Sequence, residues 1–184
     1  MEYINRNPKI FVLSGKARSG KNLVADLIEE HYKDKKCIQL SYAYYLKQYV
    51  KKISNWDGSE ETKPRKLLQE LGIELIKKQI DDSLLIRRVC EDIKVYSYFF
   101  DIIIITDARL IDEVEIITKT FDNVTTIRIN RDNFDNNLTS DEKSHLTEVA
   151  LDNYNNFDYK INNSKTIEND LNKILKEIEN GSSN

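Results

Sequence analysis

The sequence predicts an α/β protein in which helices cover both faces of a five-stranded parallel sheet. Short apolar runs alternate along the chain with segments of helical spacing, which is the pattern of strand–helix–strand crossover units. The run Ile102–Ile105 is apolar at every position, as expected of a central strand that is buried on both sides. The length of 184 residues, with 40% hydrophobic and 32% charged residues, suits one domain with a sizeable core.

Each element of this fold is indicated by a local pattern. Short β-prone runs predict the strands Lys9–Ser14, Lys36–Ser41, Ile102–Thr106, Asn123–Asn130 and Asp158–Asn162. Apolar residues at helical spacing predict helices around residues 23–28, 64–76, 111–118 and 167–178. We expect residues 1–180 to form a single domain and residues 181–184 to form a disordered tail.

Two connections are longer than ordinary loops. Residues 43–99 form a largely helical insert, and residues 131–156 form a second insert that is rich in Asp and Asn. Long inserts at one end of an α/β sheet commonly build substrate pockets and lids. We therefore expect the first insert to bind a substrate and the second to act as a lid.

Charge and hydropathy exclude several classes of partner. The 28 Lys and Arg residues are balanced by 31 Asp and Glu residues, so a nucleic-acid polymer is not expected as the main partner. The first apolar run, Ile10–Leu13, is too short for the core of a signal peptide. The apolar stretch 98–105 is interrupted by Asp101 and is too short to span a membrane. We expect a cytoplasmic protein without a membrane partner; the oligomeric state stays open.

The turn after the first predicted strand carries a phosphate-binding motif with the spacing G-x4-G-K, Gly15-Lys16-Ala17-Arg18-Ser19-Gly20-Lys21-Asn22. Its glycines allow backbone conformations closed to residues with a Cβ, so that amide groups converge on phosphate oxygens at a helix N-terminus. We expect Lys21 to be exposed and to reach the β- and γ-phosphates. Asn22 stands where Ser or Thr usually supplies a ligand to Mg²⁺. An ordinary strand-to-helix turn is the alternative, but the strand before the motif and the amphipathic helix after it favour phosphate binding.

A carboxylate and an arginine follow the third predicted strand. Asp107 lies at the carboxyl end of this strand, where parallel sheets bind their ligands. It is a candidate to hold Mg²⁺, directly or through water, or to orient the acceptor, and a helix N-cap is the alternative. Arg109 is a candidate phosphate clamp, with a surface arginine as an almost equal alternative.

Candidate acceptor residues lie in both inserts. Arg65, Gln69 and Gly72 share one side of the predicted helix that begins near Pro64. A glycine inside a helix costs about 1 kcal/mol relative to alanine, so Gly72 is expected to let a ligand or another helix approach closely. His145 and Glu148 are spaced i, i+3 in the second insert, and we assign them to the acceptor side; a solvated histidine is the alternative.

Several of these segments resemble one family. Ser14–Asn22 resembles the S-G-x-x-x-S-G-K-D loop of phage-type deoxynucleoside monophosphate kinases and animal-type phosphomevalonate kinases. Thr106–Arg109 is similar to their D-x-R motif after the third strand, and Arg65–Gly72 to the R-x-x-L-Q-x-x-G helix of nucleotide kinases. His145–Glu148 resembles an H-x-S-E motif before the last strand. The resemblance covers about residues 9–178.

The resemblance implies the P-loop NTPase fold of the nucleoside-monophosphate-kinase type, with ATP and Mg²⁺ as cosubstrate and cofactor. It assigns phosphate contacts to Lys16, Arg18, Ser19 and Lys21, and the metal or acceptor to Asp107. Arg65 and Gln69 would meet the acceptor. The second insert offers few cations for a lid, mainly Arg128, Arg131 and Lys143.

Two positions depart from the family pattern. Asn22 replaces an aspartate next to the metal, and Thr147 replaces a serine while keeping the hydroxyl. We expect an ATP-dependent kinase whose acceptor is a nucleoside or deoxynucleoside monophosphate. Phosphomevalonate or another phosphorylated metabolite is an alternative acceptor, and a nucleotide-binding regulatory module with little turnover is an alternative of another class.

Overall fold

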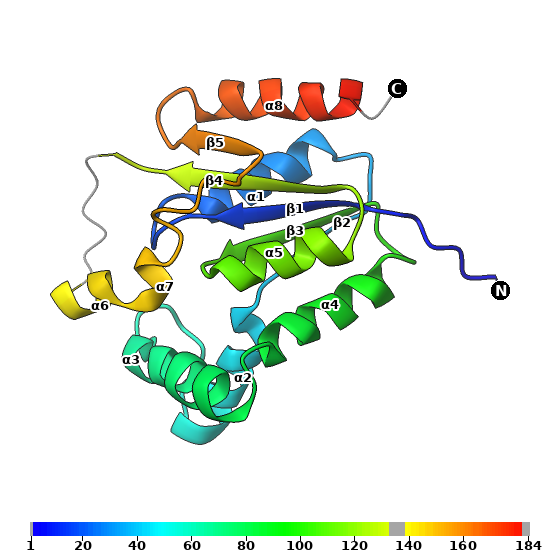
Figure 1. Ribbon diagram of the computed structural model, residues 1–184. Helices are drawn as coiled ribbons and strands as arrows, with labels where there is room; N and C mark the ends of the chain where they lie inside the picture. Colours follow the sequence, from blue (N-terminus) through cyan, green and yellow to red (C-terminus); the bar gives the residue numbers. More distant parts are fainter. Residues whose placement is uncertain (1, 133–138, 182–184) are drawn as a thin grey trace.

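A computed structural model describes residues 2–132 and 139–181, and its centre is a parallel five-stranded sheet (Figure 1). The strands are β1 (Lys9–Ser14), β2 (Cys37–Leu40), β3 (Ile102–Ala108), β4 (Val124–Asn130) and β5 (Tyr159–Asn162). Their order across the sheet is β2-β3-β1-β4-β5, and every neighbouring pair is parallel. The predicted five-stranded parallel sheet is confirmed, with strand ends that differ from the prediction by one or two residues.

Strand register places the candidate motifs side by side. β1 lies between β3 and β4, and Ser14 pairs with Ala108 on one side and with Arg128 on the other. The loop that follows Ser14 therefore starts at the same edge of the sheet as Asp107 and Arg109. This is the carboxyl edge, where ligands of parallel sheets bind.

Helices cover both faces of the sheet, as predicted. The helices are α1 (Lys21–His31), α2 (Ala43–Ser54), α3 (Arg65–Gln69), η1 (Glu70–Ile80), α4 (Leu84–Tyr96), α5 (Ile111–Thr120), α6 (Ser140–Ser144), α7 (Leu146–Val149) and α8 (Ile167–Gly181). Alternate residues of each strand point to opposite faces. In β1, Ile10 and Val12 pack with α4 and α5, whereas Phe11 and Leu13 pack with α1 and α8.

The helices α2, α3 and η1 of the first insert form a separate helical layer beside the sheet, whereas its last helix, α4, packs on the sheet itself (Figure 1). A small core of Val50, Trp56 and Leu68 joins α2, the following loop and α3. The helix predicted from Pro64 is not a single α-helix, because after Gln69 the chain continues as the π-helix η1. π-Helical turns are rare and are frequent at functional sites, and spacing alone does not distinguish them from an α-helix.

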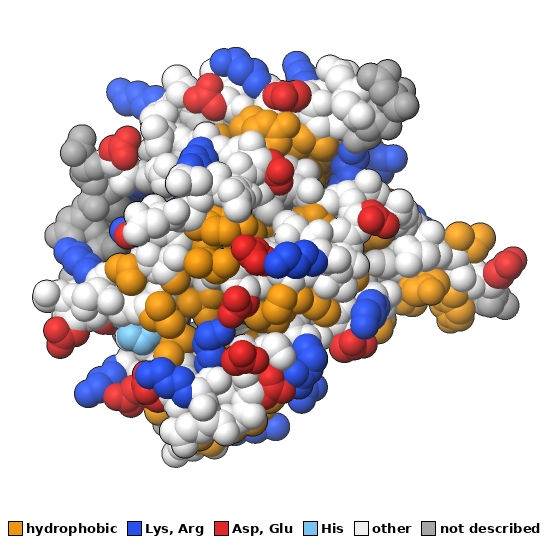
Figure 2. All heavy atoms as spheres, viewed as in Figure 1, with side chains coloured by type: hydrophobic (Ala, Val, Ile, Leu, Met, Phe, Trp, Pro, Cys, Tyr) orange, Lys and Arg blue, Asp and Glu red, His pale blue; other side chains and the backbone are white. Residues whose placement is uncertain are grey.

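The surface carries mixed charge on the face shown in Figure 2, where Lys and Arg side chains are interspersed with Asp and Glu. Hydrophobic side chains gather at the N-terminal segment, where the rings of Tyr3 and Phe99 meet edge to face with centroids 6.0 Å apart. Among the described residues, no helix combines the length and the apolar character that crossing a membrane requires.

The predicted tail and lid are described only in part. Gly181, which we assigned to the tail, is instead the last residue of α8. Glycine is common at the C-terminal ends of helices. Residues 182–184 lie outside the described residues, as do residues 133–138 of the predicted lid.

Candidate active site

The loop Gly15–Gly20 makes a compact turn between β1 and α1. Gly20 has φ of 104°, a left-handed conformation that glycine adopts without strain. A Cβ on Gly15 would lie 2.6 Å from the carbonyl oxygen of Ile129 on β4, so only glycine fits this approach of two strands. Both glycines of the motif are thus required by the backbone, as the sequence predicts.

Lys21 is buried, and the prediction that it is exposed is wrong. Only 7% of the residue is accessible, because its Nζ turns back across the loop. The ammonium donates hydrogen bonds of 2.7 Å to the carbonyl of Gly15 and 2.8 Å to that of Lys16. Burial, followed by the positive charge of Arg109, lowers the pKa of Lys21 to about 7. The lysine is held inside the loop, close to where phosphates are expected.

Ser19 provides a polar group without a protein partner. Its hydroxyl is fully buried within the loop and has no hydrogen-bond partner among the described residues. The carbonyl of Ser19 accepts a hydrogen bond of 2.8 Å from Nδ2 of Asn163, just after β5, and this bond fixes the loop to the sheet edge. A buried hydroxyl without a partner costs free energy unless a ligand satisfies it. This geometry fits a phosphate oxygen.

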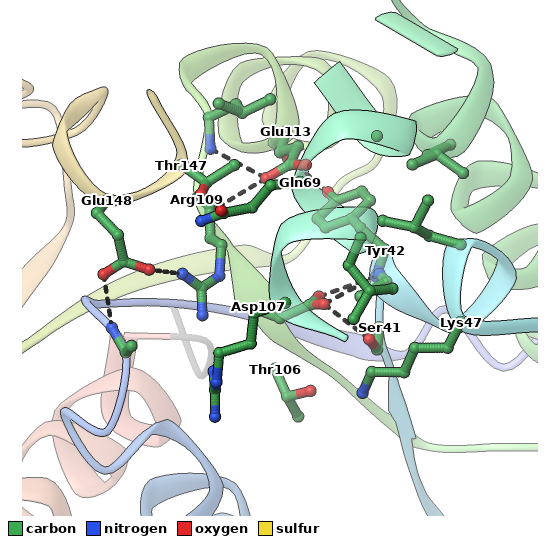
Figure 3. A pocket seen from close by; sticks show the side chains of 18 of the residues that line it. Ser41, Tyr42, Lys47, Gln69, Thr106, Asp107, Arg109, Glu113, Thr147 and Glu148 are labelled. Atoms are coloured by element: carbon green, nitrogen blue, oxygen red, sulfur yellow. Dashed lines mark hydrogen bonds and ion pairs between the residues drawn. The ribbon is translucent and has the colours of Figure 1, made fainter. Parts of the chain in front are cut away.

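Asp107 caps a helix. One carboxylate oxygen accepts from the backbone N–H of Tyr42 at 2.8 Å, and the other accepts from the Ser41 hydroxyl at 2.7 Å and from the N–H of Ala43 at 3.0 Å. The alternative of an N-cap for the following helix is wrong, because Leu110 is the N-cap of α5 and Asp107 instead accepts from N–H groups at the start of α2, a helix that precedes it in the chain (Figure 3). Since three hydrogen bonds occupy this carboxylate, it has little capacity left for a direct metal bond.

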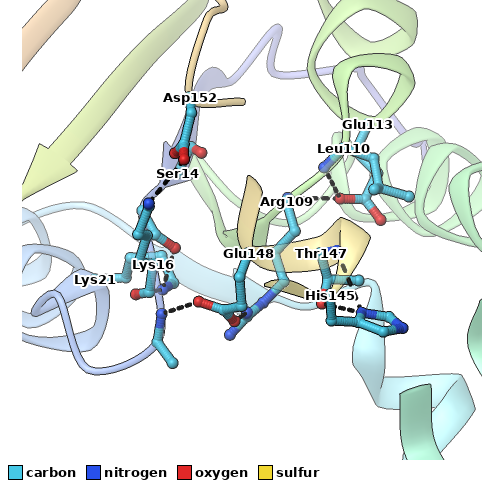
Figure 4. Close-up of polar contacts among 12 residues, drawn as sticks. Ser14, Lys16, Lys21, Arg109, Leu110, Glu113, His145, Thr147, Glu148 and Asp152 are labelled. Carbon is cyan, nitrogen blue, oxygen red and sulfur yellow. Dashed lines mark hydrogen bonds and ion pairs between the residues drawn. The ribbon is translucent and has the colours of Figure 1, made fainter. Parts of the chain in front are cut away.

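Arg109 lies between the loop and the cavity described below. Its guanidinium forms an ion pair with Glu148, whose other oxygen accepts a hydrogen bond of 2.9 Å from the backbone N–H of Ala17 (Figure 4). Glu148 lines the cavity, but both of its oxygens are bound, one to the phosphate loop and one to Arg109, so its assignment to the acceptor stays a prediction. An ordinary surface arginine does not fit, because the guanidinium of Arg109 is paired with a buried carboxylate and the residue lines the cavity.

A second carboxylate lies against the loop. Asp152 contacts Nζ of Lys16 at 2.8 Å through one oxygen and NH2 of Arg128 at 3.4 Å through the other (Figure 4). Arg128 also donates a hydrogen bond of 2.9 Å to the hydroxyl of Ser14. We counted Arg128 among the lid cations, but it belongs to β4, within the predicted strand Asn123–Asn130, and it is buried because its guanidinium contacts Ser14 and Asp152.

A cavity of about 810 Å³ opens beside the phosphate loop (Figure 3). Residues from both inserts and from the edge of the sheet line it, among them Arg18, Asn22, Lys47, Arg65, Gln69, Gly72, Asp107, Arg109, Glu113 and Thr147. The volume lies in the range of small-molecule sites. The structure thus brings Arg65, Gln69 and Gly72 to one cavity with the loop.

The predicted acceptor helix contributes in different ways. NH2 of Arg65 contacts Oε1 of Glu60 at 2.8 Å, and the side chain of Arg65 stays 31% exposed. The Gln69 side chain has no hydrogen bond to any described residue and faces the cavity (Figure 3). A Cβ on Gly72 would lie 3.1 Å from Leu46 of α2, so this glycine allows two helices to approach closely. Lys47, also on α2, is half-buried at the cavity and has no ion pair within the described residues.

Glu113 is a cavity residue that the sequence reasoning missed. It lies in the first turn of α5, and its Oε2 accepts from the backbone N–H of Arg109 at 2.6 Å and of Leu110 at 3.0 Å. Burial and then the nearby charge of Asp107, opposed by these hydrogen bonds, raise the pKa of Glu113 to about 7. The sequence gives no clear signal for this role, because the N-cap position of α5 holds Leu110 instead of the Ser or Thr of a capping box.

Two other candidates serve local structure. His145 caps α7 with its side chain, which accepts from the backbone N–H of Thr147, and it does not line the cavity. The assignment of His145 to the acceptor is therefore not supported, because its ring nitrogen is used at the helix end. Arg131 donates a hydrogen bond of 3.3 Å to the carbonyl of Arg18 and so lies beside the loop.

Mg²⁺ is compatible with the groups at this site. Among the described residues, no three His, Cys, Asp or Glu side chains form a metal cluster. Mg²⁺ on a nucleotide needs only one or two protein oxygens in addition to phosphates and water. The exposed side chain of Asn22 lines the cavity and has no hydrogen bond to the described residues, so its amide oxygen suits a direct contact. The hydroxyl of Ser41 and the carboxylate of Asp107 suit contacts through water.

Comparisons with known proteins agree with this architecture. No family model and no curated protein sequence matches the chain. The APS kinase of Mycobacterium tuberculosis, in complex with AMPPNP and APS, is similar in structure with a TM-score of 0.58 and 14% sequence identity, over 94% of this chain and 98% of that one. The shikimate kinase of Bacteroides thetaiotaomicron is similar with a TM-score of 0.51 and 15% identity, over 92% and 97% of the two chains. The chain therefore has the fold of P-loop kinases.

Proposed function

We propose that this protein is an ATP-dependent kinase that transfers the γ-phosphoryl group to a small phosphorylated acceptor, preferentially a nucleoside or deoxynucleoside monophosphate. One observation carries the proposal: the phosphate loop opens directly onto a cavity of about 810 Å³ that Arg65 and Gln69 also line. Such a cavity holds a second substrate beside the terminal phosphate of the first, which is the requirement for direct transfer.

The donor side is formed by the phosphate loop. Backbone amides at the start of α1, the buried hydroxyl of Ser19 and the ammonium of Lys21 converge on one region. Lys21 exchanges its hydrogen bonds with loop carbonyls for phosphate oxygens when ATP binds. A phosphate also favours the charged form of Lys21, so ATP binding is accompanied by proton uptake near neutral pH. When bound, Mg²⁺ supplies positive charge to the phosphates, and Asn22 is the side chain that would hold it.

The acceptor side is formed by the first insert. Arg65 and Lys47 both line the cavity and supply positive charge for the acceptor's own phosphate. Glu60 has Lys63 as a second partner, so Arg65 is able to leave it for a phosphate without isolating the carboxylate. Gln69 offers both a donor and an acceptor to a base edge. A glutamine near a pair of cations favours a nucleotide over an acceptor without a base.

A panel of acceptors tests the proposal. Mg²⁺-dependent ADP release is measured with each ribo- and deoxyribonucleoside monophosphate, with phosphomevalonate and with other phosphorylated metabolites. We expect release to rise at least tenfold with one group of monophosphates. A rise with a metabolite alone would support the alternative acceptor. ATP binding without release under any condition would support a regulatory module instead.

A further inference from the structure

Glu148 joins two parts of the site that come from distant parts of the chain. It is only 6% exposed, and each of its carboxylate oxygens has a different partner. One oxygen accepts the backbone N–H of Ala17 in the phosphate loop at 2.9 Å, and the other is paired with NH1 of Arg109 after β3 (Figure 4). A single side chain from the second insert thus fixes the distance between the loop and Arg109.

Arg109 is held at both ends. Its backbone N–H donates to Glu113 at 2.6 Å, and its guanidinium is held by Glu148. Within the described residues, Glu148 is the only side chain that accepts a hydrogen bond from this guanidinium. A guanidinium carries five N–H donors in a rigid plane, so donors remain for another anion. Arg109 lines the cavity together with Lys21 and Asp107. It lies between the phosphate loop and the acceptor wall, by which we mean Lys47, Arg65 and Gln69 of the first insert.

Phosphoryl transfer needs a cation that is aimed before the reaction begins. Negative charge spreads over the equatorial oxygens of the transferring group, and the enzyme stabilises it mainly by placing positive charge at the correct distance. A long arginine side chain in water visits many rotamers. A buried carboxylate that is itself anchored to the phosphate loop restricts Arg109 to the rotamers that face the transferring group.

We propose that Glu148 is a positioning residue for phosphoryl transfer, which acts by aiming Arg109 at the γ-phosphoryl group. The proposal rests on the kinase function proposed above. It competes with a different role for the same contacts, in which Glu148 occupies the amide of Ala17 as a substitute for phosphate and weakens ATP binding. Removing the charge of Glu148 should lower kcat if Glu148 positions Arg109, and should raise the affinity for ATP if Glu148 substitutes for phosphate. Kinetic measurements therefore separate the two roles.

The main test is the isosteric variant Glu148→Gln. Its amide oxygen still accepts from Ala17, but the charge that holds Arg109 is lost. We expect kcat to fall by about 10²-fold, as misplacement of a catalytic group by about 1 Å does, while the affinity for ATP changes less than about threefold. Glu115→Gln on the outer face of α5, where the glutamate pairs with Lys119, is the control and should keep the wild-type kcat. An unchanged kcat with ATP affinity increased tenfold or more would overturn the proposal in favour of the phosphate substitute.

A double-mutant cycle shows whether Glu148 acts through Arg109. Arg109→Ala should lower kcat by about 10³-fold, in the range observed for arginines that contact the transferring group. With Arg109 already removed, Glu148→Gln should change kcat by less than about threefold. Two independent, multiplicative losses would contradict the proposal. If Arg109→Ala does not fold because the buried Glu148 loses its cationic partner, Arg109→Lys keeps the charge and serves in the same cycle.

A measurement without turnover separates this proposal from the proposed function. The Nε–H signal of Arg109 in a ¹⁵N NMR spectrum is assigned by its loss in Arg109→Lys. We expect one narrow signal in the wild-type protein with Mg²⁺ and ADP, and a broadened signal in Glu148→Gln. If no acceptor is phosphorylated but this difference is seen, the kinase function fails while the coupling stands. If the signal is the same in both proteins, Glu148 does not position Arg109.

Discussion

The phosphate loop and the acceptor wall differ in how far their polar groups are already engaged. In the loop, Lys21 binds two carbonyls, Ala17 donates to Glu148 and Lys16 is paired with Asp152, so ATP has to exchange existing contacts. On the acceptor wall, Arg65 is paired with Glu60, but Lys47 and Gln69 make no side-chain hydrogen bond to described residues. More of the cationic groups are thus engaged in the loop than on the acceptor wall. Changes in the loop should therefore affect kcat most, and changes on the acceptor wall should affect KM most.

The largest effect is expected from the lysine of the loop. Lys21→Met should lower kcat by about 10³-fold or more, because it removes a charge aimed at the transferring phosphoryl group. The fold should persist, since the variant replaces a buried ammonium, whose burial lowers its pKa to about 7, by an apolar side chain of similar length. ADP release and thermal unfolding are measured on the same preparations. A folded variant with the wild-type kcat would refute the assignment of the loop.

The acceptor wall is tested by a pair of adjacent residues. Arg65→Ala should lower kcat/KM for the acceptor roughly 30-fold, because a charged contact to the acceptor phosphate is lost. This corresponds to a loss of about 2 kcal/mol of transition-state stabilisation. ATP affinity measured without acceptor should stay unchanged. Lys66→Ala is the matched control, since the side chain of Lys66 is 89% exposed and points away from the cavity. If Arg65→Ala weakens ATP binding and leaves acceptor dependence intact, α3 belongs to the donor site and the comparison fails.

The buried carboxyl group of Glu113 makes the stability of the folded protein depend on pH. Its pKa in the folded protein, about 7, lies above the ordinary value of 4.5, so the folded state retains a proton that the unfolded chain loses between these pH values. The free energy of unfolding therefore decreases as the pH rises from 4.5 to 7. The side chain of Glu113→Gln does not titrate, so this variant does not lose stability in that pH range. It still has an oxygen that accepts from the N–H groups of Arg109 and Leu110. At pH 8 it should be more stable than the wild type by on the order of 2 kcal/mol, and at pH 4.5 the two should be similar.

Denaturant unfolding at both pH values measures this difference. The exposed-face variant Glu115→Gln should show no such gain at pH 8. A Glu113→Gln protein that is less stable than the wild type at pH 8 would mean that the ionised carboxylate stabilises the fold. The cap of α5, rather than burial, would then dominate at this position.

The smallest effect is expected at the metal contact. Asn22→Asp adds a negative charge beside the site for Mg²⁺ and should lower the Mg²⁺ concentration for half-maximal activity by a few-fold. The acceptor KM should not change. Titration of Mg²⁺ at saturating ATP measures this. A folded but inactive variant would show that the amide of Asn22 has a role that a carboxylate cannot replace.

The fold and the loop were predictable because their signals are local. The spacing of Gly15, Gly20 and Lys21, with a strand before it and an amphipathic helix after it, predicts the phosphate loop, and the apolar run Ile102–Ile105 predicts the central strand. The partner of Asp107 was not predictable, because the helix that it caps begins at Ala43, far away in the sequence. Gly72 illustrates the same limit, since spacing indicates a close approach but not that Leu46 is the neighbour.

The inward turn of Lys21 and the ion pair of Glu148 depend on side-chain geometry. The sequence indicates that a lysine belongs to the phosphate loop, but the free loop carbonyls to which it donates exist only in the folded turn. Glu148 was assigned to the acceptor from its insert, whereas its contacts are with the loop and with Arg109, which follows β3. A sequence pattern indicates the element to which a side chain belongs, but its contact partners are determined by the tertiary structure.

The fate of the γ-phosphoryl group distinguishes phosphoryl transfer from ATP hydrolysis, which ADP release alone does not. The protein is mixed with [γ-³²P]ATP, Mg²⁺ and the acceptor that gives the strongest response in the panel, and the quenched products are separated by chromatography. We expect the label in a nucleoside diphosphate, with formation of this product slowed roughly 30-fold in Arg65→Ala at limiting acceptor. Label found only in inorganic phosphate, or product formation that Arg65→Ala leaves unchanged, would contradict the account.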